Sequence, residues 1–68
     1  MTTLWEMQLE LARKAEPGDR WKNRKTNREV EVVGRGKYRT DILLLHQDGR
    51  VTTKQEHYFA YDYYPVNA

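Results

Sequence analysis

The sequence predicts a mainly β fold, in which a small five-stranded barrel carries an N-terminal α-helix packed on it. Two observations lead to this prediction. Apolar residues recur at helical spacing before Pro17 and alternate at strand spacing after it. A chain of 68 residues is also long enough for only one domain. We therefore expect a single domain over residues 1–68, with the helix at 3–15 and the barrel at 18–66.

The N-terminal helix is expected to begin at a capping box of Thr3 and Glu6, in which each side chain accepts a hydrogen bond from the other residue's backbone N–H. Its wide apolar face is made of Leu4, Trp5, Met7, Leu9, Leu11, Ala12 and Ala15. Pro17 cannot continue the helical hydrogen bonds and ends the helix. So short a helix needs a surface to cover. We favour one end of the barrel over a dimer seam or a partner protein.

Alternation after the proline predicts a first hairpin. Residues 20–22 are expected to form a short strand, residues 23–27 a polar turn, and residues 28–33 a second strand with Val30 and Val32 facing inward. This stretch combines a turn, a large aromatic residue and a basic tip. It can therefore start the barrel and carry charge at the same time.

The next stretch is expected to supply the longest strand. Gly34 and Gly36 indicate a bulge or a second loop before it. Residues 38–47 then alternate in a way that leaves apolar side chains on both faces, with Leu43 and Leu45 on the second face. Apolar residues on both faces indicate a strand that is covered on both sides. We expect the N-terminal helix to cover the second face.

The end of the chain predicts a second hairpin and a closing strand. An Asp-Gly pair at residues 48–49 is a strong hairpin signal and leads into a strand at 50–55. Residues 56–62 suit a single helical or 3₁₀ turn, and residues 63–66 a last short strand that Pro65 places at an edge. The order of a helix, four strands, a tight turn and a fifth strand matches an SH3-like barrel.

Several pieces of the chain form a pattern of a Trp-containing strand, a valine-rich strand and aromatic-rich closing segments. They are Arg20-Trp21, residues 28–33, Phe59 and Tyr64-Pro65-Val66. In this pattern, residues 18–66 resemble a group of short phage and prophage proteins of unknown function. The resemblance implies a phage or prophage origin and an SH3-like barrel, and it brings no catalytic residues.

Basic charge is confined to the middle of the chain. The net charge is +2, yet residues 20–39 carry eight basic residues against two acidic ones, while the segments on either side are each net negative. Clustered cations suit phosphate contacts, and they equally suit a solvated surface or a protein contact. The candidate nucleic-acid-binding residues are Arg20, Lys22, Arg24, Lys25, Arg28, Arg35, Lys37 and Arg39.

Aromatic residues give a second candidate surface, because tyrosine and tryptophan are enriched at binding hot spots. The candidate protein-binding residues are Trp5, Leu9, Tyr61, Tyr63 and Tyr64. The favoured function is that of an accessory protein that binds and modulates a host or phage protein through its helix or its tyrosine-rich end. Nucleic-acid binding through the basic block is the alternative, and a homodimer is a further arrangement that the sequence leaves open.

Signatures of catalysis are missing from the sequence. It has no Gly-rich phosphate loop, no cysteine and no serine, and His46 and His57 are not at a metal-ligand spacing. We therefore expect no enzymatic activity, cofactor or metal, with His46 capping the core through one bonded ring nitrogen and His57 solvated.

No segment approaches the roughly 18–20 apolar residues of a membrane span, and no signal peptide is recognisable. We expect no membrane partner and a location in the cytoplasm of a bacterial host.

Overall fold

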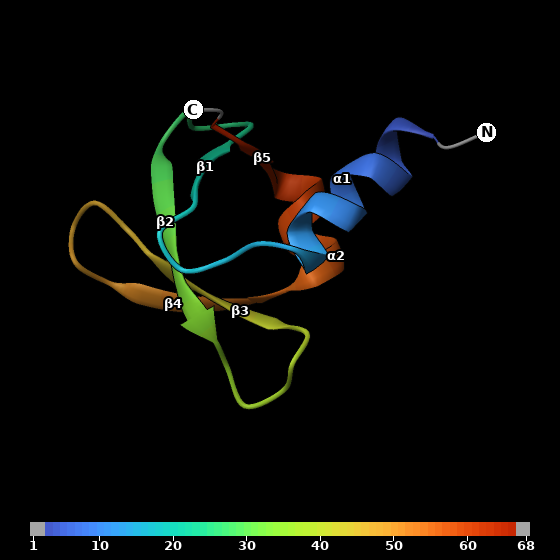
Figure 1. Ribbon diagram of the computed structural model, residues 1–68. Helices are drawn as coiled ribbons and strands as arrows, with labels where there is room; N and C mark the ends of the chain where they lie inside the picture. Colours follow the sequence, from blue (N-terminus) through green and yellow to red (C-terminus); the bar gives the residue numbers. More distant parts are fainter. Residues whose placement is uncertain (1–2, 67–68) are drawn as a thin grey trace.

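The computed structural model describes residues 3–66, which form two helices and one five-stranded antiparallel sheet (Figure 1). In chain order the elements are α1 (Leu4–Arg13), β1 (Arg20–Asn23), β2 (Glu29–Arg35), β3 (Asp41–Leu45), β4 (Val51–Gln55), α2 (Glu56–Asp62) and β5 (Tyr63–Pro65). The strands lie in the order β4-β3-β2-β1-β5, and every neighbouring pair is antiparallel. The predicted N-terminal helix and mainly β fold are confirmed. The sheet itself is open, because β4 and β5 are its two edges.

Helix α1 begins where the sequence predicts. The Thr3 hydroxyl oxygen accepts a hydrogen bond from the backbone N–H of Glu6 at 3.1 Å, which is the first half of the expected capping box. In the second half, the Glu6 carboxylate accepts the Thr3 hydroxyl at 3.1 Å instead of the backbone N–H. The helix ends at Arg13, two residues earlier than expected, and Lys14 caps it with its backbone N–H directed at the carbonyl of Glu10.

The core lies between the concave side of the sheet and the two helices, which lie side by side (Figure 1). Its centre is aromatic: the Trp21 and Phe59 ring centroids are 4.4 Å apart, and Tyr63 stacks on Phe59 at 5.2 Å. Val30 and Val32 face inward, as predicted. The other buried residues are Ala12, Ala15, Ile42, Leu44 and Ala60.

Two expectations about the third strand were wrong. Strand β3 spans only Asp41–Leu45, and β2 with seven residues is the longest strand. Tyr38 lies exposed in the loop before β3, where the Asp41 backbone N–H bonds to the Tyr38 carbonyl. Helix α1 does not cover Leu43 and Leu45, which are half-buried on the outer face. Helix α1 packs on α2 instead. Because α2 follows β4 and lies on the inner face of the sheet, α1 lies on that face too, which is the face where Leu44 is buried.

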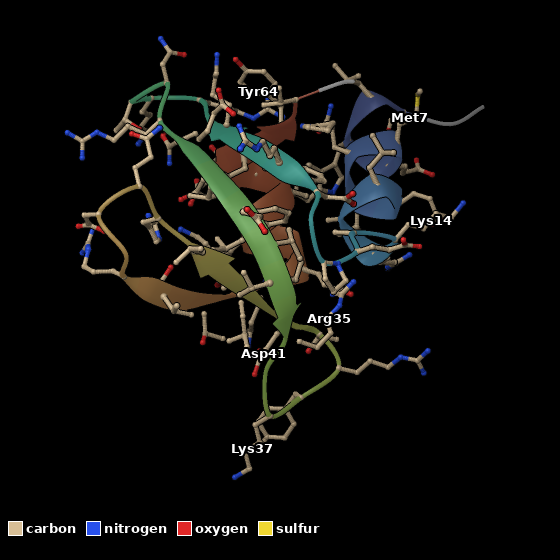
Figure 2. All side chains as sticks on the ribbon, turned by 60° about the vertical axis from the view of Figure 1, so that its left-hand side comes forward. Met7, Lys14, Arg35, Lys37, Asp41 and Tyr64 are labelled. Carbon is tan, nitrogen blue, oxygen red and sulfur yellow. The ribbon has the colours of Figure 1, made fainter. Side chains whose placement is uncertain are left out.

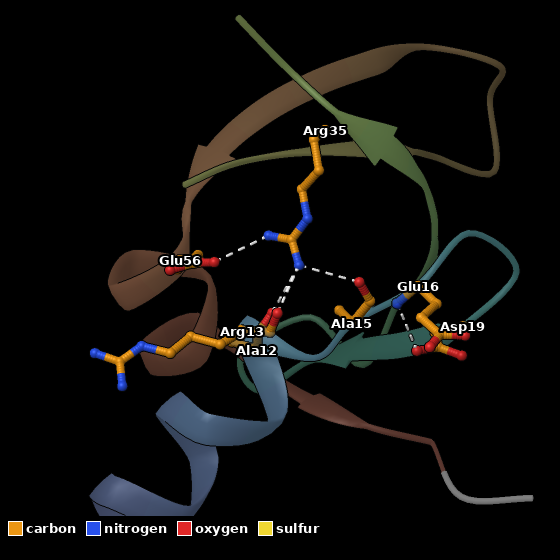
Figure 3. Close-up of polar contacts among 7 residues, drawn as sticks. All are labelled: Ala12, Arg13, Ala15, Glu16, Asp19, Arg35 and Glu56. Atoms are coloured by element: carbon orange, nitrogen blue, oxygen red, sulfur yellow. Dashed lines mark hydrogen bonds and ion pairs between the residues drawn. The ribbon is translucent and has the colours of Figure 1, made fainter. Parts of the chain in front are cut away.

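Arg35 fastens the end of α1 to the sheet. It follows an irregularity in the pairing of β2 with β3 between Val32 and Gly34, which agrees with the bulge that was one of the two arrangements expected there. Its guanidinium donates to Glu56 on α2 at 3.1 Å, and its second terminal nitrogen reaches three carbonyl oxygens at the end of α1 (Figure 3). These are the carbonyls of Ala12, Arg13 and Ala15, at 3.4, 2.9 and 3.0 Å. The positive charge also opposes the negative end of the helix dipole.

The edge strand β5 is protected against pairing with another strand. Pro65 has no N–H, and the Tyr63 N–H is used to cap α2 through the carbonyl of Phe59. The Tyr64 backbone faces β1 in the ladder. The predicted edge position of Pro65 is thereby confirmed.

Neither helix within residues 3–66 combines the length and the apolarity needed to cross a membrane.

Candidate functional site

A groove of about 560 Å³ lies between the first half of α1, the C-terminal half of α2 and the tip of the β1–β2 hairpin. We call it the α1–α2 groove. It is lined by Leu4, Trp5, Gln8, Asn23, Arg24, Lys25, Ala60, Tyr61 and Asp62. Three segments that are far apart in the sequence therefore build it together.

Trp5 and Tyr61 form the aromatic wall of the groove. Their rings meet edge to face, with centroids 6.2 Å apart and planes at 71°. Both remain accessible, with exposed fractions of 43% for Trp5 and 69% for Tyr61. The pair arises because Trp5 lies on the flank of α1 that faces α2, while Tyr61 lies near the end of α2. Each ring has an accessible apolar surface that a ligand could cover.

The floor of the groove is largely apolar but contains one unsatisfied polar atom. Ala60 is buried beneath it, and Leu4 borders it with an exposed side chain. The side-chain oxygen of Gln8 is buried and finds no hydrogen-bond partner within residues 3–66. A buried acceptor without a donor costs about 1–3 kcal/mol. Because this oxygen is sealed from solvent, the cost falls on the fold and is not one that a ligand in the groove can remove.

Arg24 connects the hairpin to the end of α2. Its backbone N–H donates to the Asp62 carbonyl at 2.9 Å, and its Nε donates to the Tyr61 carbonyl at 3.1 Å. The guanidinium carbon also lies 5.5 Å from the centre of the Tyr64 ring, within the range of a cation–π contact. These contacts place a fixed positive charge on the rim of the groove.

The hairpin tip is held by its own side chains. The Asn23 side-chain oxygen accepts from the backbone N–H groups of Lys25 at 2.8 Å and Thr26 at 3.0 Å. Asn27 adopts a φ of 60°, a left-handed conformation that asparagine tolerates well. The turn therefore presents Lys25 in a defined position beside the groove.

Charge at the groove is positive. Within residues 3–66, neither Arg24 nor Lys25 has a carboxylate oxygen within 4.0 Å. The one carboxylate among the lining residues, that of Asp62, is engaged with the Lys54 ammonium at 2.7 Å. An anion that approaches the groove thus meets unpaired cations and a neutralised carboxylate.

The structure does not gather the eight candidate nucleic-acid-binding residues along one side. Arg20 is 3.6 Å from Glu29, and Lys22 stands opposite Glu29 in the strand register. Arg35 is turned toward the helices and is only 28% exposed. Lys37 and Arg39 lie in the β2–β3 loop, and Lys37 is at the opposite end of the molecule from Tyr64 (Figure 2). Of the eight, Arg24 and Lys25 line the α1–α2 groove, whereas Arg28 borders a separate hollow beside Asp48 and Arg50 of the β3–β4 turn.

The candidate protein-binding residues divide in a similar way. Trp5 and Tyr61 meet at the groove, whereas Leu9 packs against the core and Tyr63 is buried within it. Tyr64 is half-buried beneath Arg24. Sequence reasoning missed the parts of the groove that Leu4 and Gln8 supply. The available signal was the position of Gln8, a polar residue placed inside the apolar face of the helix.

The histidines lie apart from the groove. The His46 Nε2 is 2.7 Å from the Thr52 hydroxyl, so the predicted single bonded ring nitrogen is confirmed, and His57 is exposed as predicted. Within the described part of the chain, no group of three His, Asp or Glu side chains is arranged to hold a metal ion.

In the β3–β4 turn, hydrogen bonds from the Arg50 backbone and side chain hold the pKa of Asp48 below its ordinary value.

Comparisons with protein-family models, with curated proteins and with solved structures found no match to this chain. Function is therefore inferred from the groove itself.

Proposed function

We propose that this chain acts by binding a protein through the α1–α2 groove. The observation that carries the proposal is the meeting of Trp5, Tyr61 and Arg24 at an open groove with an apolar floor. Tryptophan, tyrosine and arginine are the residue types that dominate binding hot spots. The two rings already contact each other edge to face, which reduces the side-chain freedom that is lost when a partner covers them.

Nucleic-acid binding is the second candidate function. It is favoured by the two cations Arg24 and Lys25 beside accessible aromatic rings, a combination that can hold phosphates and stack bases. It is disfavoured by the next cations along β1, Arg20 and Lys22, because glutamates stand opposite them. Phosphate contacts would then be limited to the hairpin tip.

The wider setting is also part of the proposal. The strand order, with a helical turn between β4 and β5, supports an SH3-like barrel architecture with an open seam. The resemblance to short phage and prophage proteins supports a non-enzymatic accessory protein that modulates a host or phage protein in the cytoplasm of a bacterial host.

Selection from a random peptide library tests the proposal. The purified chain is immobilised, and binding of the enriched peptides is measured by calorimetry with Tyr61→Ala and Tyr58→Ala. The two tyrosines are a matched pair, because both are exposed on α2 and only Tyr61 lines the groove. We expect Tyr61→Ala to weaken binding by about 30-fold, equivalent to a hot spot of about 2 kcal/mol, and Tyr58→Ala to change it by less than about twofold.

Two outcomes would overturn protein binding at this site: no peptide is enriched, or both tyrosine variants bind equally. A parallel titration with labelled single-stranded and duplex DNA covers the second candidate. DNA binding that weakens with salt and in Lys25→Ala, together with no enriched peptide, would establish nucleic acid as the ligand instead.

A further inference from the structure

We infer that the segment bound by the α1–α2 groove is an acidic peptide with an apolar anchor residue. This inference rests on the proposed function and adds the chemistry of the partner. It starts from the charges around the groove, where Arg24 and Lys25 lie on the rim and have no carboxylate within 4.0 Å in the described part of the chain. Complementary charge across an interface raises the association rate and selects among partners.

The negative charge nearest to these cations is already compensated. Asp62 lines the groove, but its carboxylate is 2.7 Å from the Lys54 ammonium. Glu6 on the neighbouring turn of α1 does not line the groove, and its carboxylate accepts the Thr3 hydroxyl. An incoming aspartate or glutamate is therefore attracted by the rim without strong repulsion from the groove.

The extent of the positive surface favours a short acidic segment over a phosphate backbone. A bound nucleic acid strand carries a phosphate at every nucleotide and needs cations along its track. Beyond the hairpin tip, the outward-facing residues of β1 stand opposite Glu29 and Glu31 on β2. A strand that followed β1 would run alongside these carboxylates. A peptide needs only one or two acidic side chains within reach of Arg24 and Lys25.

The floor of the groove specifies the rest of the ligand. Leu4, Trp5 and Ala60 offer an apolar surface for one aliphatic or aromatic side chain. A carboxylate for the cationic rim and an apolar side chain for the floor together describe an acidic peptide with an apolar anchor.

Three sub-libraries of matched peptides test this chemistry. Each has a degenerate central position drawn from Leu, Phe and Trp, flanked in the first by Asp and Glu, in the second by Asn and Gln, and in the third by Lys and Arg. Binding to the full chain is measured at low and high salt. We expect the acidic set to bind at least about tenfold more tightly than the neutral set at low salt, and the difference to shrink at high salt because salt screens exposed charges.

A pair of charge reversals locates the effect. Lys25→Glu is expected to weaken the acidic set by about tenfold, since it removes one exposed attraction and adds a repulsion. Lys37→Glu is the control, because it makes the same change of net charge at the far end of the molecule. It is expected to change affinity by less than about twofold.

The outcomes separate the inference from the proposed function. If the neutral set binds as tightly as the acidic set and Tyr61→Ala abolishes both, the groove binds peptides and the acidic partner is wrong. Equal losses in Lys25→Glu and Lys37→Glu also overturn the acidic partner, because the effect would be one of net charge. If none of the three sets binds, the proposed function and this inference both fail.

Discussion

Replacing Arg35 with methionine should loosen the attachment of both helices to the sheet. The guanidinium joins β2 to Glu56 on α2 and to three carbonyl groups at the end of α1 (Figure 3). Methionine keeps much of the length and the apolar stem but removes the charge and all of the donors. The side chains of Arg35 and Glu56 are 28% and 16% exposed, so water only partly replaces what is lost.

We expect this substitution to lower the free energy of unfolding by about 2–4 kcal/mol. Hydrogen bonds to charged groups contribute about 1.5–3 kcal/mol each, and an unpaired, mostly buried carboxylate is left behind. The helix carbonyls at the surface can be rehydrated, which keeps the total below the sum of the four contacts. A chain of this length has a total stability of only about 3–10 kcal/mol, so the loss would be large.

Urea denaturation followed by circular dichroism and tryptophan fluorescence measures the effect. Arg20→Met is the matched control, because its ion pair with Glu29 is exposed and such pairs contribute only about 0–1 kcal/mol. The double variant Arg35→Met with Glu56→Met tests the mechanism. It should be more stable than the two single effects added together predict, since neither charge is then left unpaired.

The reasoning would be refuted if Arg35→Met cost no more than Arg20→Met. It would also be refuted if the losses from Arg35→Met and Glu56→Met simply added in the double variant. Either result would mean that α1 is held by its apolar contacts with α2 and that the guanidinium contributes little.

Two further predictions concern the ends of elements. Thr3→Ala should lower stability by about 1 kcal/mol, and the melting temperature by about 4–8 °C, because the Glu6 N–H loses its acceptor; Thr3→Ser should restore both. The pKa of Asp48 should lie below its ordinary value of 3.8 in an NMR titration, and Arg50→Ala should raise it only part of the way, because the backbone N–H of Arg50 remains. With its pKa lowered on folding, Asp48 stabilises the fold above its ordinary pKa, and this contribution is lost as the pH falls through the folded-state value.

Local signals were sufficient for the elements that depend on neighbouring residues. The cap at Thr3, the inward pair Val30 and Val32, and the edge position of Pro65 each follow from rules that act over a few residues. Strand β3 is shorter than the alternating stretch at residues 38–47. Residues 38–40 form a turn before the strand, in which the Asp41 N–H is bonded to the Tyr38 carbonyl. Alternation alone does not indicate where a strand gives way to a loop.

The buried side of α1 could not be predicted from its periodicity. The apolar face was wide enough to be covered in several ways, and the structure buries Ala12 and Ala15 while Leu4 and Met7 remain exposed. The neighbouring helix decides this, because α2 presents the small residue Ala60 and small side chains let two helices approach closely. The same choice leaves Trp5 beside Tyr61, so the groove is a product of tertiary packing.

The basic block shows why a charge excess does not by itself identify a ligand surface. Two of its arginines serve the fold, and they do so in the same way at the two helices. Arg35 binds the carbonyl groups at the end of α1, and Arg24 binds the Tyr61 carbonyl at the end of α2. Each places a cation where a helix exposes unpaired acceptors and the negative end of its dipole. Lys25 has no such partner in the described chain, so it is the cation of the groove rim that is most available to a ligand.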